Sequence, residues 1–212
     1  TSKKGDALPQ EFFAAARNVY ANDPHWPMED EAVVRWMFSP QHAYGEAIDW
    51  VICGFGEEAR AGVFFDPNLQ MDGGSAAVFG YWEGANTLEA HRSVLDFAAS
   101  WARDHGAKRL YGPINFSTYY AYRIRIEGFL DEPPFPGECY NPPYYQTVLE
   151  DLGFELRESY LSLRPNDYAF PAFEKIGAAT EAKLNQAGLN ALVMTPEYWL
   201  ENRKRIFPIF QA

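Results

Sequence analysis

Apolar residues in the first part of the chain follow a helical spacing and then a strand spacing. Residues 9–21 and 28–38 place apolar side chains three or four positions apart, which predicts two amphipathic helices. The stretches 47–55, 59–65 and 75–82 are apolar and aromatic and are separated by turn residues. These three stretches predict an antiparallel meander.

The pattern then changes to that of a crossover. A long amphipathic helix is predicted over 87–105, with Asn86 as its cap and Glu89 completing a capping-box pair. A short strand follows at 108–111 and ends at a Gly-Pro pair. A helix between two strands permits them to run parallel, whereas tight turns make neighbours antiparallel. The predicted fold class is therefore α/β with a mixed sheet.

Residues 113–142 form an unusual stretch that holds four tyrosines and five of the chain's 15 prolines. So aromatic a segment does not remain a solvated linker, and we predict a structured loop with a helical turn near 117–124. A helix over 143–152 and a strand over 154–163 follow.

Beyond this point the pattern predicts a helix over 171–187, a short strand over 189–194 and a helical tail from Pro196. We assign residues 1–165 to one domain. Residues 166–212 form a C-terminal extension, which would also fit the start of a truncated second domain.

Composition limits the classes of function. The 212 residues carry 18 basic and 29 acidic side chains, a net charge of −11, and 47% are hydrophobic. This balance predicts a folded protein and disfavours general nucleic-acid binding, because phosphate contacts need clustered lysine and arginine. No apolar run reaches the about 20 residues that cross a bilayer. Cys53 and Cys139 stand apart from each other, which predicts unpaired thiols and a cytoplasmic location.

The order of elements resembles the GCN5-related N-acetyltransferase (GNAT) superfamily. The segments that carry the resemblance are Phe79 to Glu83, Thr87 to Gly106, Lys108 to Asn115 and Asn141 to Phe154. The resemblance implies a meander, a strand and helix that hold acyl-CoA, a fifth strand splayed from the fourth, a further helix and a final hairpin. We expect the strands to part after Trp82 and Tyr111 and to leave a slot for a pantetheine-sized arm.

A closer resemblance is to a bacterial branch of that superfamily, whose members often continue into a second, related domain. It rests on four short motifs that occur in order between residues 18 and 163: Asp23-Pro24-x-Trp26, Gly112-Pro113-x-Asn115, Glu127-Gly128-Phe129 and Asn141-Pro142-x-Tyr144-Tyr145.

Amine acylation needs a base for the ammonium proton, a donor for the oxyanion and an acid for the departing thiolate. The resemblance assigns these roles to Glu83, Asn115 and Tyr145 in that order. The structural alternatives are a solvated carboxylate at a strand end, a side chain that caps the turn and a tyrosine that only packs.

The resemblance implies acyl-CoA as cosubstrate, with no permanently bound cofactor. Its contacts are assigned to the end of the fourth strand and the start of the long helix, at Tyr81, Trp82, Gly84, Asn86, Thr87, His91 and Arg92. The chain departs from the family here, because the stretch from Asn86 to His91 lacks the glycines of the usual phosphate loop.

The aromatic loop and the helix after it are the predicted acceptor pocket, through Phe116, Tyr119, Arg123, Tyr140 and Tyr144. Arg123 and Arg125 would either clamp a carboxylate or phosphate of the substrate or pair with Glu127, Asp131 or Glu132. The histidines have no partner spacing typical of a metal site, so no metal is expected.

Three functions follow from these patterns. The first is an N-acyltransferase that moves an acyl group from acyl-CoA to an amine of a small molecule or amino acid. The second is a non-catalytic binding or assembly domain of the same fold, and the third is a transferase that takes its acyl group from aminoacyl-tRNA. The apolar tail 207–212 predicts a second domain or another copy of the chain as a partner.

Overall fold

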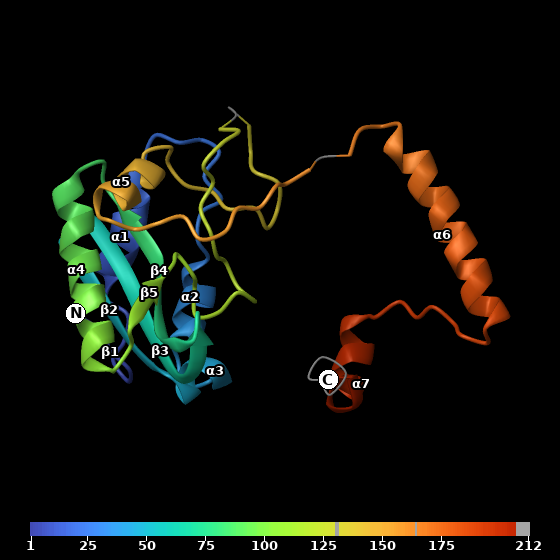
Figure 1. Ribbon diagram of the computed structural model, residues 1–212, viewed down its shortest axis with the longest axis horizontal. Helices are drawn as coiled ribbons and strands as arrows, with labels where there is room; N and C mark the ends of the chain where they lie inside the picture. Colours follow the sequence, from blue (N-terminus) through green and yellow to red (C-terminus); the bar gives the residue numbers. More distant parts are fainter. Residues whose placement is uncertain (130–131, 164, 207–212) are drawn as a thin grey trace. The chain divides into compact units, whose positions relative to one another are not determined.

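The computed structural model describes residues 1–129, 132–163 and 165–206. They form two compact units, Thr1–Leu156 and Arg157–Ala212, each with its own secondary structure (Figure 1). The assignment of residues 1–165 and 166–212 to separate domains remains a prediction. In the described part of the chain, no helix has the length and apolar content of a membrane span.

The first unit is built on one five-stranded sheet, in the order of the chain. Its strands are β1 (Ser2–Lys3), β2 (Asp49–Phe55), β3 (Ala59–Met71), β4 (Gly74–Gly84) and β5 (Arg109–Tyr111). Neighbouring strands are antiparallel except β4 and β5, which are parallel. The predicted meander, crossover and mixed α/β sheet are confirmed, in the element order expected for a GNAT-like fold.

Helices cover both faces of this sheet (Figure 1). They are α1 (Gln10–Val19), α2 (Glu31–Met37), α3 (Ala43–Ala47), α4 (Leu88–Asp104) and α5 (Tyr145–Asp151). Alternate residues of the inner strands face opposite layers, as the period of two in a strand requires. Trp50 and Ile52 pack with α1 and α2, whereas Val51 and Cys53 lie on the α4 side.

One local prediction is wrong here. Residues 154–163 are not a strand, since none of them joins the sheet of the described residues, and most of their side chains are exposed. Residues 43–47 form a short helix that the sequence pattern did not indicate, and the predicted strand at 47–55 begins two residues later, at Asp49. The stretch 117–124 makes the single turn predicted for it, in which the N–H of Tyr120 donates to the carbonyl oxygen of Ser117 at 3.1 Å, and the left-handed φ of 67° at Arg123 follows.

The second unit contains α6 (Ala169–Gln186) and α7 (Pro196–Ile206). The predicted strand at 189–194 is irregular there. Neither helix buries a residue within the described chain, and Phe170, Phe173 and Ile176 of α6 are exposed. The tail 207–212, expected to contact a partner, lies outside the described residues.

β4 and β5 part soon after they pair. Their ladder has three residue pairs and ends at Val78 and Tyr111. One more backbone hydrogen bond follows, in which the N–H of Ile114 donates to the carbonyl oxygen of Phe79 at 2.6 Å. The predicted divergence is present, but it begins at Phe79, earlier along β4 than expected.

Residues 112–115 fill the narrow end of this divergence. The Oδ1 of Asn115 accepts a hydrogen bond from the N–H of Tyr81 at 2.7 Å. Gly80 permits this close approach, since a Cβ there would lie 2.2 Å from the carbonyl oxygen of Ile114. The space that remains between the strands therefore begins beyond Tyr81.

Replacing Gly80 by alanine tests this close approach. The methyl group would push residues 113–115 away from β4, and we expect Gly80→Ala to lower the free energy of unfolding by about 1–3 kcal/mol, the usual cost of overpacking. Chemical denaturation followed by circular dichroism measures it. Gly74→Ala on the same strand is the control, because its Cβ would meet only the flexible Lys108 side chain at 3.6 Å. Equal stability of the two variants would contradict the packing described.

Candidate active site

A β-bulge sets the direction of the last side chains of β4. The register with β3 shifts at Tyr81, whose backbone has a left-handed φ of 48°. Val78 and Tyr81 both lie in the core under α1, and Phe79 and Trp82 both lie in the core under α4. The two residues of each pair are three positions apart, whereas residues on the same face of a regular strand are two apart. The extra residue of the bulge turns the side chain of Glu83 toward the end of α1.

A cavity of about 160 Å³ lies where β4 and the segment after β5 separate. The end of β4 forms one wall, and the aromatic loop forms most of the rest. Its lining residues are Glu29, Tyr81, Trp82, Glu83, Pro113, Asn115, Tyr145 and the segments 121–124 and 138–141. The predicted site residues that line it are Tyr81, Trp82, Glu83, Asn115, Arg123, Tyr140 and Tyr145.

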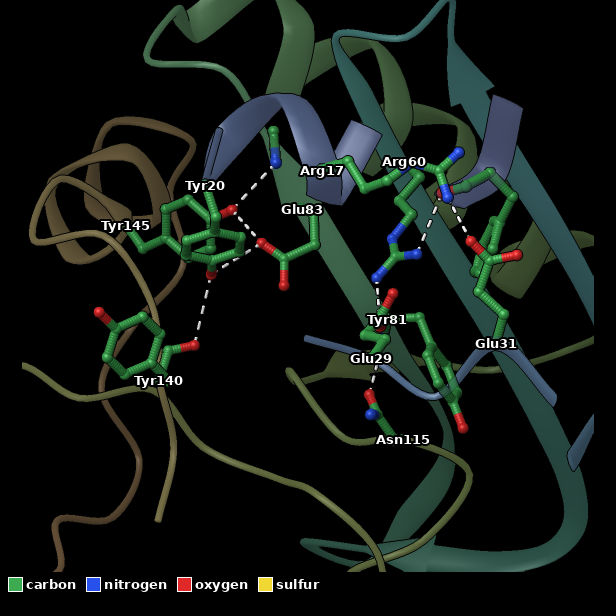
Figure 2. Close-up of polar contacts among 12 residues, drawn as sticks. Arg17, Tyr20, Glu29, Glu31, Arg60, Tyr81, Glu83, Asn115, Tyr140 and Tyr145 are labelled. Atoms are coloured by element: carbon green, nitrogen blue, oxygen red, sulfur yellow. Dashed lines mark hydrogen bonds and ion pairs between the residues drawn. The ribbon is translucent and has the colours of Figure 1, made fainter. Parts of the chain in front are cut away.

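The carboxylate of Glu83 is held by two phenols on one oxygen. Tyr145 donates to Oε2 at 2.5 Å and Tyr20 donates to the same atom at 3.1 Å (Figure 2). The Tyr145 hydroxyl in turn accepts from the N–H of Gly84 at 3.0 Å. Oε1 receives no hydrogen bond from any described residue, so one carboxylate oxygen is fixed and the other is left for a ligand in the cavity.

Burial raises the pKa of Glu83 to about 7. The positive charge of Arg60 and the two phenol hydrogen bonds lower this pKa, but they only partly offset the loss of hydration. A carboxylate that changes charge near neutral pH is suited to accept a proton from an ammonium group.

Tyr20 owes its position to the first sequence motif. Its ring stacks on Trp26 with ring centroids 4.9 Å apart. Asp23 of the same motif accepts a hydrogen bond from the Tyr140 hydroxyl at 2.6 Å, which holds the cavity wall next to Tyr20. The Asp-Pro-x-Trp motif therefore supports the site and does not itself line the cavity.

Two further carboxylates of the lining are already paired with arginines. Glu29 Oε1 accepts from the buried guanidinium of Arg60 at 2.5 Å. Glu138 accepts from Arg123 at 3.4 Å, a partner that the sequence did not predict. The expected partner Asp131 lies outside the described residues. Glu83 is consequently the one lining carboxylate, among those described, without an ion-pair partner.

The two tyrosines of the Asn-Pro-x-Tyr-Tyr motif both bind the end of β4. Tyr144 donates to the carbonyl oxygen of Gly84 at 2.7 Å, and Tyr145 donates to Glu83. Burial raises the pKa of Tyr145, and the charge of Glu83 raises it further. Its proton is thus committed to Glu83, which is a different position from that of an acid facing a leaving thiolate.

Asn115 uses its oxygen within the protein. Oδ1 accepts from Tyr81, and the Nδ2 group donates to no described residue. The backbone of Asn115 is also bound, since its N–H donates to the carbonyl oxygen of Ala121 at 2.8 Å. The amide nitrogen of a lining residue is therefore available as a donor into the cavity.

The start of α4 differs from the sequence prediction. Thr87, not Asn86, is the N-cap residue, and no side chain makes a cap hydrogen bond. His91 is fully buried and packs against Gly84, Trp82 and Tyr145, and burial lowers its pKa to about 4. Arg92 is exposed on the first turn. Of these two predicted cosubstrate contacts, Arg92 is accessible to solvent and His91 is a neutral core residue.

Three of the predicted substrate residues do not line the cavity. Phe116 is buried in the core, with its ring centroid 4.2 Å from that of Phe64. Tyr119 is 92% exposed. Tyr144 contributes through Gly84 and does not line the cavity either. Of the five predicted acceptor residues, Arg123 and Tyr140 therefore face the cavity.

Sequence reasoning missed Tyr20, Glu29, Arg60 and Cys139 at this site. Tyr20 precedes the Asp-Pro-x-Trp motif by a few residues, which was the only signal for it. Arg60 lies on an apolar strand and is fully buried, with its guanidinium 4.4 Å above the Phe12 ring. An arginine within an inner strand could have been singled out as a buried charge that needs a partner. Among the described residues no group of three metal-ligand side chains occurs.

Comparison with known proteins gives similarities of fold. No family model and no curated protein matches the chain. Solved structures that match include a glucosamine-6-phosphate N-acetyltransferase from Arabidopsis thaliana (9% identity, TM-score 0.42, 78% of this chain and 100% of that one). A transcriptional regulator from Bacillus halodurans (13%, 0.44, 76% and 97%) and an acetyltransferase from Trypanosoma brucei (9%, 0.41, 76% and 97%) also match.

Removing a phenol donor should shift the titration of Glu83. Each phenol stabilises the charged carboxylate, so Tyr145→Phe and Tyr20→Phe should both raise the pKa of Glu83 above about 7, with the larger change for the shorter bond of Tyr145. Carboxyl ¹³C chemical shifts followed against pH measure it. Tyr119→Phe, at an exposed position, is the control. An unchanged or lower pKa in Tyr145→Phe would refute the assignment.

Glu83 should also make stability depend on pH. Its pKa is raised on folding from 4.5 to about 7, so between these values the folded state keeps a proton that the unfolded state has lost. Stability therefore falls as the pH rises through this window, by about 3 kcal/mol at about 1.4 kcal/mol per pKa unit. Glu83→Gln should remove most of this fall in denaturation curves at several pH values. Glu155→Gln, at an exposed position, should leave it unchanged.

Proposed function

We propose that this protein is an N-acyltransferase that moves an acyl group from an acyl-CoA thioester to the amine of a small molecule. One observation carries the proposal. A carboxylate with a pKa of about 7 has one oxygen held by two phenols and the other directed to a cavity between diverging parallel strands. General base catalysis at neutral pH requires such a group.

Glu83 acts as the base. Its free Oε1 accepts a proton from the substrate ammonium and leaves a neutral amine with an electron pair for attack. The amine nitrogen forms a bond to the thioester carbonyl carbon, and the carbon–sulfur bond then breaks. The second proton of the attacking nitrogen passes to the thiolate, and Glu83 returns its proton to water, so the amide and a free thiol are the products.

Asn115 and Tyr145 support this reaction in different ways. The free Nδ2 of Asn115 donates a hydrogen bond to the developing oxyanion, while its Oδ1 remains fixed on Tyr81. Tyr145 positions Glu83 by holding Oε2 and so directs Oε1 to the amine. A thiolate of ordinary pKa leaves without a dedicated acid near neutral pH.

The start of α4 suits the phosphates of the acyl donor in part. Its first turn has no side-chain cap, so its first backbone N–H groups are left to bind an anion, and Arg92 adds a positive charge nearby. Gly84 is the only glycine close to this turn, and the loop is otherwise unlike the glycine-rich form of the superfamily.

A second candidate is a non-catalytic domain that binds an amine. The observation in its favour is that the bulge N–H of Tyr81 and the hydroxyl of Tyr145 are both bound within the protein. In that case neither group would take part in a reaction, and the cavity would serve recognition alone.

Kinetics with a panel of acyl-CoA thioesters and small amines distinguish the two candidates. We expect amide formation and thiol release with kcat/KM rising with pH through an apparent pKa of about 7, because Glu83 must be deprotonated. Glu83→Gln should lower kcat/KM by about 10²–10⁴-fold, the usual contribution of a general base. Tyr145→Phe should shift the pH profile to higher pH.

Tyr119→Phe serves as the control for these variants, since its side chain is exposed and lies away from the cavity. If amines bind and no thioester of the panel acylates them, the non-catalytic candidate is favoured. If Glu83→Gln retains full activity and an unchanged fold, Glu83 is not the base.

A further inference from the structure

The cavity carries a specific charge pattern that narrows the substrate. Two of its carboxylates are neutralised by arginines, Glu29 by Arg60 and Glu138 by Arg123, and Glu83 remains with a free oxygen. Ionised Glu83 therefore adds one negative charge that no described cation pairs directly. A ligand with one positive charge balances it, since a buried charge is stabilised only by a partner.

The volume limits the size of the part of a ligand that the cavity encloses, and the open side of the cavity leaves any remainder outside. A cavity of about 160 Å³ is close to the about 150 Å³ that holds a benzene molecule in an engineered protein core, so about six to eight non-hydrogen atoms fit. The walls beside Glu83 are aromatic, through Tyr81, Trp82, Tyr122, Tyr140 and Tyr145. Aromatic faces stabilise a cation and accommodate an apolar skeleton.

The same pairs disfavour a carboxylate on the ligand. Arg123 is the lining cation, and Glu138 already occupies its guanidinium at 3.4 Å. The buried Arg60 likewise donates to Glu29 and to the Phe12 carbonyl oxygen. An amino-acid carboxylate would have to displace Glu138 or lie near the charge of Glu83, and both cost binding free energy.

We propose that the acceptor is a small apolar amine with one positive charge and no carboxylate, and that the Arg123–Glu138 pair excludes the corresponding amino acids. This inference rests on the proposed function and names the substrate class of the same site. Within the two classes that the sequence left open, small amines and amino acids, it selects the first.

Matched ligand pairs test the proposal without any acyl donor. The pairs are 3-methylbutylamine with leucine and benzylamine with phenylglycine, each tested up to about 10 mM by thermal shift. The shift in melting temperature depends on the ratio of ligand concentration to Kd.

A second readout is the rate at which Cys139 reacts with a thiol reagent at about pH 8.5. Cys139 lines the cavity, whereas Cys53 is buried, and a Cys139→Ser protein gives the background rate.

We expect the Kd of each amine to be lower than that of its amino acid by a factor of about ten or more, and we expect the amine to slow the reaction of Cys139. Glu83→Gln should weaken amine binding by about tenfold or more, through loss of the charged hydrogen bond. Glu138→Gln should remove one carboxylate from Arg123 and so narrow the difference in affinity between the amine and the amino acid. Tyr119→Phe should behave as the unchanged protein in both readouts.

Equal or tighter binding of the amino acids by the unchanged protein overturns the proposal, as does the absence of any effect of the amines. Adding acyl-CoA thioesters separates this inference from the proposed function. Amines that bind but are never acylated contradict the acyltransferase function and leave the ligand class standing. Acylation of the amino acids in preference to the amines contradicts the ligand class and leaves the acyltransferase function standing.

Discussion

The loss of hydration of one carboxylate, that of Glu83, is the constraint on which the site depends. Withdrawing a charged group from water is costly, and the protein offsets the cost with groups from three elements. Tyr20 comes from the end of α1, Arg60 from β3 and Tyr145 from α5. Glu83 has its raised pKa and its fixed orientation only when these elements are packed together, so the reactive group depends on the folding of the whole first unit.

The aromatic loop completes the site because its backbone is well bound despite its irregular course. The side chain of Asn141 accepts from the N–H of Arg125 at 2.7 Å and donates to the carbonyl oxygen of Arg125 at 3.1 Å. Asn115 makes a similar connection to β4. Asn115 of the Gly-Pro-x-Asn motif thus fixes the loop to β4, and Asn141 of the Asn-Pro motif joins two parts of the loop to each other, so that both hold the cavity wall in place.

Local patterns allowed much of the fold to be predicted. The meander, α4 and the parallel β5 followed from apolar spacing and turns, whereas Glu83 and Asn115 were singled out through the family resemblance of the segments that contain them. The predicted strand at 154–163 failed because an apolar pattern does not show whether a second strand will pair with it, and among the described residues this stretch pairs with none. Tyr20 and Glu29 escaped prediction because each is brought to Glu83 or Arg60 by contacts between distant segments.

The sequence by itself determined where the long helices and the three strands of the meander form, since these depend on the spacing of neighbouring side chains. It also determined which residues follow the strands that separate. Only the tertiary structure decided that both phenols bind the same oxygen of Glu83, that His91 is buried and that Arg123 is paired with Glu138. The pKa of a carboxyl and the charge of a cavity depend on groups far apart in the chain, and their distances are fixed only when the core is packed.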